Sequence, residues 1–468
     1  MTTTPAPAPS TPSAPPSPGL PDGLLLSYYG DDFTGSTDVM DAFTAAGIPT
    51  VLFLSPPRKE DLAAFGPIRC VGLAGQSRGQ NPAWMRQELP AAFGSLASLG
   101  APILQYKVCS TFDSSPHTGS IGQAIDIGVG LTDAPWSPMI VGAPRLQRYQ
   151  VFGHLFAAAN GEVHRIDRHP TMSRHPVTPM TEGDLRLHLK QQTTRRIALI
   201  DMAQLNQGAG QARLTEIQEE NQPVVLVDVA DLATQIEAGR LVWENRGSGL
   251  FSASSSGLQY ALAAYWRSAG LLTGHTTLAP LAPVACMAAV SGSCSPMSAA
   301  QIRWAREHGF ATLRLDVQAC LDDASAGVEI ERLARAACAS IDGGVSPIVY
   351  SAEGPDDPAV TGFEALSQST GLGKEQGVAR IGQALAEVMR RILDGTPVRR
   401  VVVAGGDSSG AVASHLGIKA LTVAAGLVPG VPLCRAWSDT PRRDGIEIAL
   451  KGGQLGAASF YGQVRDGA

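Results

Sequence analysis

The 468-residue sequence lacks the features of a membrane-spanning, disulfide-stabilised or nucleic-acid-binding protein. No apolar run approaches the roughly 20 residues that a helix needs to cross a bilayer. The net charge of −6 disfavours a general nucleic-acid surface and favours solubility. The seven cysteines are scattered, odd in number and never in C-x-x-C spacing, so they indicate neither a zinc site nor a disulfide framework. We therefore expect free, buried thiols in the reducing cytoplasm, and no nucleic-acid or membrane partner.

The first 23 residues lack lysine, arginine and any long apolar stretch. Proline, alanine, serine and threonine dominate them, a composition typical of an extended, disordered tail. Without a basic start and an apolar segment, they do not form a secretory signal or transit peptide of the usual kind. We predict that residues 1–23 are dispensable for folding and activity.

Two nucleotide-binding signatures are also missing. The sequence has no G-x-G-x-x-G and no G-x-x-x-x-G-K-S/T, which disfavours a Rossmann dehydrogenase and a P-loop NTPase. A nucleotide would have to be held by glycine-bearing turns of another kind.

The composition is that of a well-packed globular protein, with 44% hydrophobic and 17% charged residues, and the length indicates two or three domains. Strand-like apolar runs alternate with helix-like stretches, which predicts α/β domains with mostly parallel sheets. A segment with glycine, threonine and proline over residues 270–283 interrupts this pattern. We predict one domain over residues 24–275, a second over 283–468, and an active-site cleft between them.

A glycine turn between residues 400 and 417 carries the strongest sign of function. Val401–Val403 predict a buried strand, and Gly405 and Gly406 let the backbone turn and approach a ligand closely. A helix is expected over residues 411–416, with three candidate N-cap residues before it: Asp407, Ser408 and Ser409. A strand, a glycine turn and a helix start together form an anion site, most often for phosphate. The alternative is an ordinary capped turn, but a carboxylate in a phosphate turn indicates a role with Mg²⁺ or in proton transfer.

Two further small-residue turns follow strands in the same half of the chain. The first contains Ser291, Gly292, Ser293 and Ser295. The second contains Lys451, a possible phosphate partner, with Gly452 and Gly453. Three such turns on one sheet favour nucleotide binding over three unrelated loops.

Residues 30–38, GDDFTGSTD, form an acidic turn of similar layout near the start of the chain. Asp31 and Asp32 would lie at the carboxyl end of a strand, where ligands bind in open α/β sheets. Paired carboxylates there suit the hydroxyl groups of a polyol, or a metal ion. The alternative is that one acid caps a helix while the other is solvated. We favour a binding site because other small and polar residues accompany the pair: Thr34, Gly35 and Asp38.

Cationic side chains follow several later strands. Residues 105–115 carry Lys107, Ser110, Thr111 and Asp113; residues 142–149 carry Arg145 and Arg148; residues 165–179 carry Arg165, Arg168, His169, Arg174 and His175. Such groups suit an acidic or phosphorylated small molecule. Each could equally be a solvated loop charge, and the histidine spacing is not that of a metal site.

These segments together resemble the four-carbon acid sugar kinases, which phosphorylate threonate, erythronate, their oxo relatives and similar acids with ATP. The matching segments are GDDFTGSTD (30–38), RYQVFGHLF (148–156), HPVTPMTEGDL (175–185), SGSCSPMSAAQI (291–302), GGDSSGAV (405–412) and LKGGQLG (450–456). They are similar, in the same order, to the family's ADDxTGAxD, RTVYQGxLF, HPLTPMxxSNL, GSxS, GG(E/D)TSGA and LKSGxFG. The resemblance runs from Leu24 to Tyr461 and implies an N-terminal substrate domain and a C-terminal nucleotide domain.

One segment departs from the family pattern K-x-D-S-T-L-R-G. After Lys107, Cys109 stands in place of the acid and Asp113 in place of the arginine. If that arginine binds the substrate carboxylate in relatives, another cation must do so here, and we expect Arg148. The departure leaves kinase chemistry intact but points from threonate and erythronate towards a related oxo or branched acid such as 3-oxo-isoapionate.

The resemblance assigns roles that fit phosphoryl transfer from ATP with Mg²⁺. The acid sugar would be held by Asp31, Asp32, Lys107, Ser110, Thr111 and Arg148. ATP would be held by Ser291, Ser293, Gly405, Gly406, Asp407, Ser408, Gly452 and Gly453. Asp407 is the expected general base or Mg²⁺ ligand, with Asp31 or Asp32 as the other candidates for the base.

Two other functions remain open at this level, as does a homodimer. A two-lobed, non-catalytic sensor of an acidic metabolite would not need the acid at position 407. A metal-dependent sugar-acid dehydratase or aldolase would use Asp31 and Asp32, but it would not need the nucleotide-like turns.

Overall fold

The computed structural model describes residues 19–159, 161–175, 177–219, 222–273, 278 and 280–467, and for Asp407 it describes the backbone alone. The predicted tail therefore lies outside the described residues up to position 18. The end of the tail contacts the folded chain: Leu20 packs against the core and Arg69 donates a hydrogen bond to the carbonyl of Pro21. Dispensability thus stays a prediction for residues 1–18, while residues 19–23 belong to the packed structure.

The N-terminal half contains eleven described strands and eight described α-helices. The strands are β1 (Leu26–Gly30), β2 (Thr50–Phe53), β3 (Cys70–Ala74), β4 (Ile103–Lys107), β5 (Ser137–Met139), β6 (Arg148–Val151), β7 (His154–Ala159), β8 (Glu162–Arg165), β9 (Ile197–Ile200), β10 (Val224–Val227) and β11 (Leu250–Ser254). The helices are α1 (Phe33–Ala46), α2 (Pro82–Ser98), α3 (Ile121–Val129), α4 (Leu185–Lys190), α5 (Met202–Asn206), α6 (Gly210–Gln218), α7 (Leu232–Glu244) and α8 (Gly257–Ser268).

The C-terminal half continues the α/β alternation. Its strands are β12 (Ala288–Ser291), β13 (Ala311–Arg314), β14 (Pro347–Tyr350), β15 (Arg400–Ala404), β16 (Ile418–Val428), β17 (Val431–Ser438) and β18 (Glu447–Lys451). Its helices are α9 (Pro296–Glu307), α10 (Val317–Leu321), α11 (Asp323–Asp342), α12 (Pro358–Thr361), α13 (Phe363–Ser369), α14 (Lys374–Gly395), α15 (Gly406–His415) and α16 (Phe460–Asp466). Among the described residues no helix combines the length and apolarity needed to cross a bilayer.

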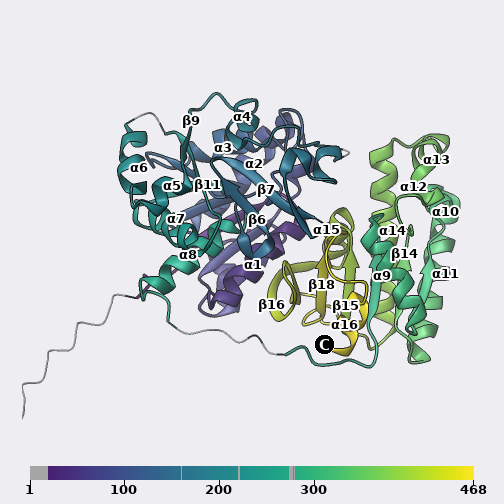
Figure 1. Cartoon of the computed structure of the whole chain (residues 1–468). Coiled ribbons are helices and arrows are strands. Elements are labelled where there is room, and N and C mark those ends of the chain that lie inside the picture. Colours follow the sequence, from purple (N-terminus) through teal and green to yellow (C-terminus); the bar gives the residue numbers. More distant parts are fainter. Residues whose placement is uncertain are drawn as a thin grey trace, which may run out of the picture.

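The two halves share one sheet, which the sequence did not predict. Figure 1 shows the N-terminal half, in purple to teal, beside the C-terminal half, in green to yellow. Twelve of the described strands form the shared sheet in the order β11-β4-β1-β3-β2-β16-β17-β18-β15-β12-β14-β13. Strands β11 to β2 are parallel to one another, as are β18 to β13, and the antiparallel strands β16 and β17 join the two groups. The prediction of two α/β parts with mostly parallel strands is confirmed.

Each buried strand divides its side chains between the two faces of the sheet. In β1, Leu26 and Tyr28 belong to the same hydrophobic core as Phe43 of α1, whereas Tyr29 belongs to a second core with Phe93 of α2. This alternation is the ordinary period of a strand. Because both faces are covered, the strands are apolar throughout, as the sequence pattern indicated.

The joint between the halves is made by one strand pair and one helix pair. β2 and β16 are antiparallel neighbours, with Leu52 opposite Leu421. On the same side, α1 packs against α15, and a Cβ added to Gly410 would lie 3.4 Å from Phe33. The first hydrophobic core accordingly contains residues of both halves. This brings the acidic helix start of the N-terminal half to the glycine helix start of the C-terminal half.

A small antiparallel sheet, β6-β7-β8, was not predicted at all. Its strands are short and partly exposed, so they lack the apolar runs that mark the main sheet. The tight turn at Phe152 and Gly153 joins the first two strands, and Asp228 accepts hydrogen bonds from both backbone N–H groups. The sheet matters because it starts at Arg148.

Candidate active site

The acidic turn after β1 is organised by an arginine from another strand end. Arg78 lies in a short 3₁₀ turn after β3, and its Nη2 is 2.7 Å from Oδ1 of Asp31. Its Nε donates to the second oxygen of Asp31 at 3.1 Å, and its Nη1 donates to Asp32 at 2.8 Å. Burial raises the pKa of Asp31, and the Arg78 charge opposes that shift.

Asp32 also begins α1. Its Oδ1 accepts a 2.5 Å hydrogen bond from the N–H of Gly35, and it is the N-cap of the helix. Burial alone would raise the pKa of Asp32, but Arg78, Lys107 and the capping N–H outweigh burial and lower it. The alternative of one capping acid is thus observed for Asp32, but the other acid is buried in an ion pair rather than solvated.

Lys107 ends β4 directly beside this turn. Its side chain is 3% exposed, and its Nζ is 3.9 Å from Oδ2 of Asp38. A Cβ on Gly35 would lie 2.6 Å from that Nζ and 2.3 Å from Oδ1 of Asp32. A Cβ at position 35 would therefore force the ends of the Lys107 and Asp32 side chains to move. The predicted residues Asp31, Asp32 and Lys107 are brought together here.

The loop after Lys107 holds Ser110 and Thr111. Both follow the strand as predicted: Ser110 is partly exposed and Thr111 is buried. The Thr111 hydroxyl donates to Asp113, and the Cys109 thiol lies 2.9 Å from that hydroxyl. Burial raises the pKa of Cys109, so the thiol stays protonated.

Arg148 enters from the small sheet. Its Nη1 donates to the carbonyls of Leu146 and Gln147 at 3.0 and 3.2 Å. Its Nε is buried and has no hydrogen-bond partner among the described residues. Burial lowers the pKa of Arg148, while the nearby groups Cys109 and Asp113 act in the opposite direction. A desolvated guanidinium with an unused N–H is suited to an anionic ligand.

The basic segment 165–179 contributes little to this site. Arg165 pairs with Asp167 at 2.6 Å, and Arg168 lies near the same acid with 77% of its side chain exposed. His175 accepts the N–H of Thr178 within a turn. His169 lies near Arg148. Burial is the larger cause that lowers the pKa of His169, and the Arg148 charge is the second. The solvated-charge alternative holds for most of this segment.

The three glycine-bearing turns of the C-terminal half meet one another. The hydroxyl of Ser295 donates to the carbonyl of Gly453 at 2.6 Å, which joins the turn after β12 to the turn after β18. A Cβ on Gly453 would lie 2.5 Å from Oγ of Ser293, and a Cβ on Gly292 would lie 2.1 Å from Oγ of Ser408. These approaches allow no side chain, so glycine is needed at both positions.

The turn after β15 differs in detail from its prediction. Gly405, with φ of 124°, is the N-cap, and α15 begins at Gly406. The expectation that Asp407, Ser408 and Ser409 cap a helix starting near residue 411 is wrong, because the glycine pair already completes the turn. Asp407 lies in the first helical turn, and its side chain is outside the described part of the structure. The free N–H groups at the start of α15 lie at the positive end of the helix dipole, which favours an anion.

Lys451 forms hydrogen bonds with the backbone of the turn after β18. Its Nζ donates to the carbonyls of Gly452 and Gly453 at 3.0 and 3.3 Å. The side chain is fully buried, and burial lowers its pKa to about 8. The lysine therefore shapes the turn itself, a role that the sequence did not indicate.

The letters of residues 406–410, GDSSG, also match the G-x-S-x-G of hydrolase nucleophile elbows. In such an elbow the serine occupies a strained turn and is exposed. Here Ser408 is a buried helical residue and is not among the described residues with positive φ. A nucleophilic serine is therefore not supported.

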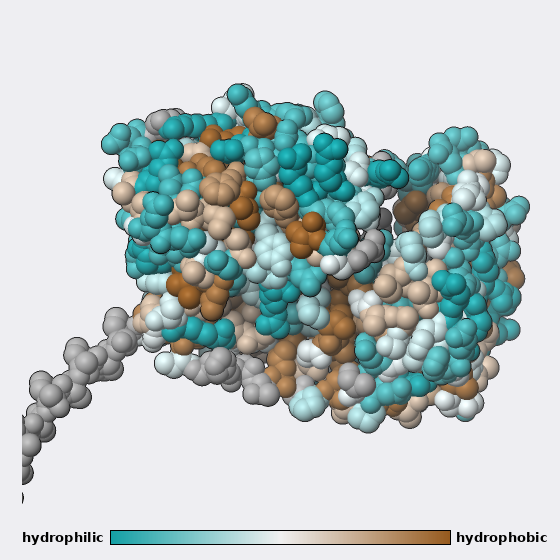
Figure 2. All heavy atoms as spheres, in the orientation of Figure 1, coloured by the Kyte–Doolittle hydropathy of each residue, from teal (hydrophilic) through white to brown (hydrophobic). Residues whose placement is uncertain are grey.

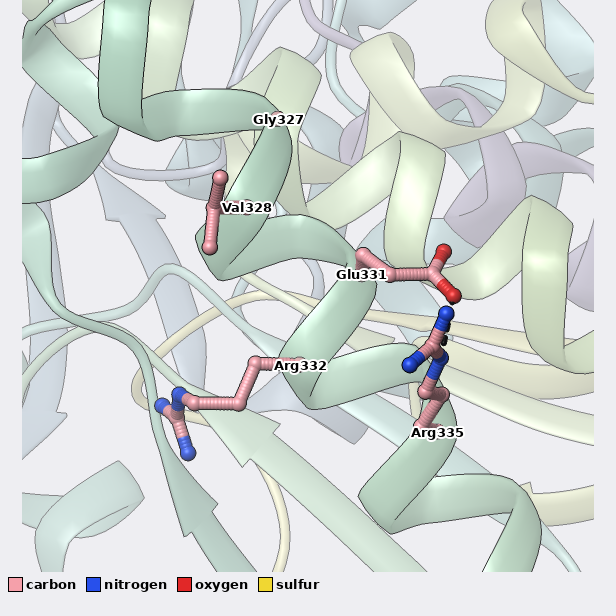
Figure 3. A pocket seen from close by; sticks show the side chains of 5 residues that line it. All are labelled: Gly327, Val328, Glu331, Arg332 and Arg335. Atoms are coloured by element: carbon pink, nitrogen blue, oxygen red, sulfur yellow. Dashed lines mark hydrogen bonds and ion pairs between the residues drawn. The ribbon is translucent and has the colours of Figure 1, made fainter.

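No group of three or more described His, Cys, Asp or Glu residues is arranged to hold a metal ion. A depression of about 570 Å³ on α11 is lined by one helix face with Val328, and its Glu331 is paired with Arg335 (Figure 3). This depression is lined by α11 and by none of the turns described above, and its lining includes no buried polar side chain.

The fold and the two turn clusters define a two-part enzyme that binds a sugar acid on one half and a nucleotide on the other. Residues 26–262 match the family model described as a sugar-binding N-terminal domain, and residues 288–461 match the nucleotide-binding C-terminal domain. The chain belongs to the four-carbon acid sugar kinase family. It is an enzyme, a kinase acting on a small acid sugar, and the sensor and dehydratase alternatives are set aside.

Named relatives agree along nearly the whole chain. The 3-oxo-isoapionate kinase of Paraburkholderia graminis is 63% identical over 96% of this chain and 95% of its own length. The 3-oxo-tetronate kinase of Methylobacterium radiotolerans is 30% identical, with 95% and 99% covered. A solved structure from Salmonella typhimurium LT2 is 25% identical, with a TM-score of 0.76 over 94% of this chain and 98% of that one.

Proposed function

We propose that this enzyme transfers the γ-phosphoryl group of ATP, with Mg²⁺, to a hydroxyl of 3-oxo-isoapionate. The observation that carries the proposal is the 63% identity to a 3-oxo-isoapionate kinase, against 30% or less for the 3-oxo-tetronate kinases named among its relatives. The substitution of Cys109 and Asp113 into the substrate loop supports a branched acid over the unbranched ones.

The N-terminal half binds the acid in this proposal. Arg78 is already neutralised by Asp31 and Asp32, so it has little charge to offer a substrate carboxylate. Arg148, with its unused Nε–H, is the better partner for the carboxylate. Lys107 is held only at 3.9 Å from its acid and can turn to a ligand oxygen. Ser110 and Thr111 offer hydroxyl groups in the same loop.

The C-terminal half binds ATP. The joined turns at Ser291, Ser293 and Ser408 supply hydroxyl groups, and Gly405, Gly406, Gly452 and Gly453 let the phosphates approach the backbone. Mg²⁺ is ordinarily held by the phosphates with one or two carboxylates and water, so it does not require a dedicated cluster of protein ligands. Asp407 belongs to the first turn of α15, the helix start at which we propose that the phosphates bind. When bound, the ion neutralises charge on the transferred group.

Asp407 is the proposed general base. Asp32 caps α1 and its pKa is lowered, which disfavours it as a proton acceptor. Burial raises the pKa of Asp31, but Arg78 holds both of its oxygens. Closure of the two halves over the substrates excludes water and limits ATP hydrolysis. Figure 2 shows the surface hollowed between the halves at the upper edge of the view.

The test is a coupled ADP-release assay over four- to six-carbon acid sugars. We expect the highest kcat/KM with 3-oxo-isoapionate, and ADP release that depends on both the acid and Mg²⁺. Turnover of threonate or 3-oxo-tetronate alone would contradict the choice of acid. A cytoplasmic location, supported by seven free cysteines, belongs to the same proposal.

A further inference from the structure

The substrate loop after β4 is held in one conformation by its own packing. Phe112 is fully buried, has φ of 63° and packs its ring against His188 with centroids 5.7 Å apart. The Ser114 hydroxyl donates to the carbonyl of Phe112 at 3.0 Å and lies 3.0 Å from Nε2 of His188. A left-handed backbone at a bulky residue is costly and persists only when the surroundings enforce it. The loop therefore presents its polar side chains in a fixed direction.

Asp113 is the buried acid that this loop presents. Its side chain belongs to a residue that is 8% exposed, and its Oδ1 accepts the Thr111 hydroxyl proton at 2.5 Å. Because that proton is used, the Cys109 thiol donates to Thr111, and a short chain of hydrogen bonds ends on the carboxylate. The hydrogen bond from Thr111 is made to Oδ1 of this carboxylate.

Arg148 and Asp113 are close enough for their charges to interact. The two charges act on each other, yet no ion pair within 4.0 Å joins them in the described structure. The charges of Arg148 and Asp113 both act on the pKa of His169 as well. The Nε–H of Arg148 is buried without a partner among the described residues, and the Asp113 carboxylate, which Thr111 binds at Oδ1, is an acceptor close enough to act on the Arg148 charge.

A carboxylate beside the site of an anionic substrate is unfavourable unless it accepts a hydrogen bond from that substrate. In 3-oxo-isoapionate the carbon that bears the carboxylate also bears a hydroxymethyl branch, which 3-oxo-tetronate lacks. We propose that Asp113 is a specificity-determining residue that accepts a hydrogen bond from this hydroxymethyl group while Arg148 binds the neighbouring carboxylate. This inference rests on the proposed function and adds the group that selects the branched acid.

The test compares the two acids on one enzyme preparation. Asp113→Asn keeps the size of the side chain and removes its charge. We expect kcat/KM for 3-oxo-isoapionate to fall on the order of 10- to 100-fold, the loss typical of a hydrogen bond to a charged group. For 3-oxo-tetronate kcat/KM should stay level or rise, and KM for ATP should not change. The ratio of the kcat/KM values for the two acids does not depend on the fraction of folded enzyme.

A substrate analogue makes the same test on the wild-type protein. An acid with a methyl branch in place of the hydroxymethyl branch should lose a similar factor with wild-type enzyme and lose nothing further with Asp113→Asn. The control is Asp126→Asn, which removes another partly buried acid, paired with Arg195, from the same half and should leave the ratio unchanged. Equal effects on both acids, or full activity of wild type on the methyl analogue, would overturn the inference. Failure of wild type to use 3-oxo-isoapionate would instead overturn the proposed function.

Discussion

Single residues in this enzyme are constrained by charges that meet from distant parts of the chain. Arg78 binds two acids that lie 47 and 46 positions before it. Gly35 is glycine because Lys107 and Asp32 leave no room for a Cβ. Such constraints make the effects of small substitutions specific.

Gly35→Ala is expected to damage acid binding selectively. The added carbon would displace Nζ of Lys107 and the capping carboxylate of Asp32, and shifts of that size typically cost on the order of 10- to 100-fold in rate. We predict such a loss in kcat/KM for the acid, with KM for ATP within about twofold of wild type. Gly94→Ala is the matched control, because a Cβ there meets nothing within 4 Å. Equal losses in the two variants would contradict the crowding argument.

Asp407→Asn tests the proposed base. Helix α15 is capped by Gly405, so the substitution should leave the melting temperature nearly unchanged. If the carboxylate receives the hydroxyl proton, kcat falls on the order of 100-fold or more, and ATP affinity without metal stays level or improves. If the carboxylate binds Mg²⁺, added Mg²⁺ restores part of the rate. A near-normal kcat at ordinary Mg²⁺ would exclude both roles and return Asp31 and Asp32 as candidates.

At the scale of elements, each predicted turn joins a buried strand to a helix or to another turn. The strand predicted at Val401–Val403 lies within β15, Arg400–Ala404. The small sheet β6-β7-β8 was missed because its strands are short and half exposed. The turn after β18 is held by its own lysine.

Lys451 predicts a pH dependence of stability. Its pKa is about 8 in the folded chain against 10.5 when exposed, so the unfolded chain binds more protons between these pH values. In that window this group makes the free energy of unfolding rise with pH, by up to about 3 kcal/mol. Urea titrations of wild type and Lys451→Met from pH 7 to 10.5 should show this rise only in wild type. Parallel curves for the two proteins would contradict the lowered pKa.

The whole molecule is one cooperative body in spite of its two functional halves. One sheet and one hydrophobic core run through both. Cutting the chain between the halves would expose the edge of β16 and the apolar face under α1.

A fragment of residues 283–468 is therefore expected to be much less stable than the full chain. We predict a single urea transition for the full chain, with coincident fluorescence and circular dichroism curves, and a lower midpoint or aggregation for the fragment. If soluble fragment retains ATP binding, calorimetry should detect no acid-sugar binding to it. Two separate transitions in the full chain would show that the shared core contributes little.

Local chemistry by itself determined which turns we propose as ligand sites. A buried strand followed by glycine and polar residues at a helix start is recognisable without knowing the fold, and Asp31, Lys107, Ser293 and Gly405 were predicted in this way. Tertiary structure alone decided how those turns work. Arg78 pairs with its acids, the Asp113 charge acts on Arg148, and β2 pairs with β16. Each of these contacts joins residues far apart in the chain and depends on the strand order, which periodicity and spacing do not predict.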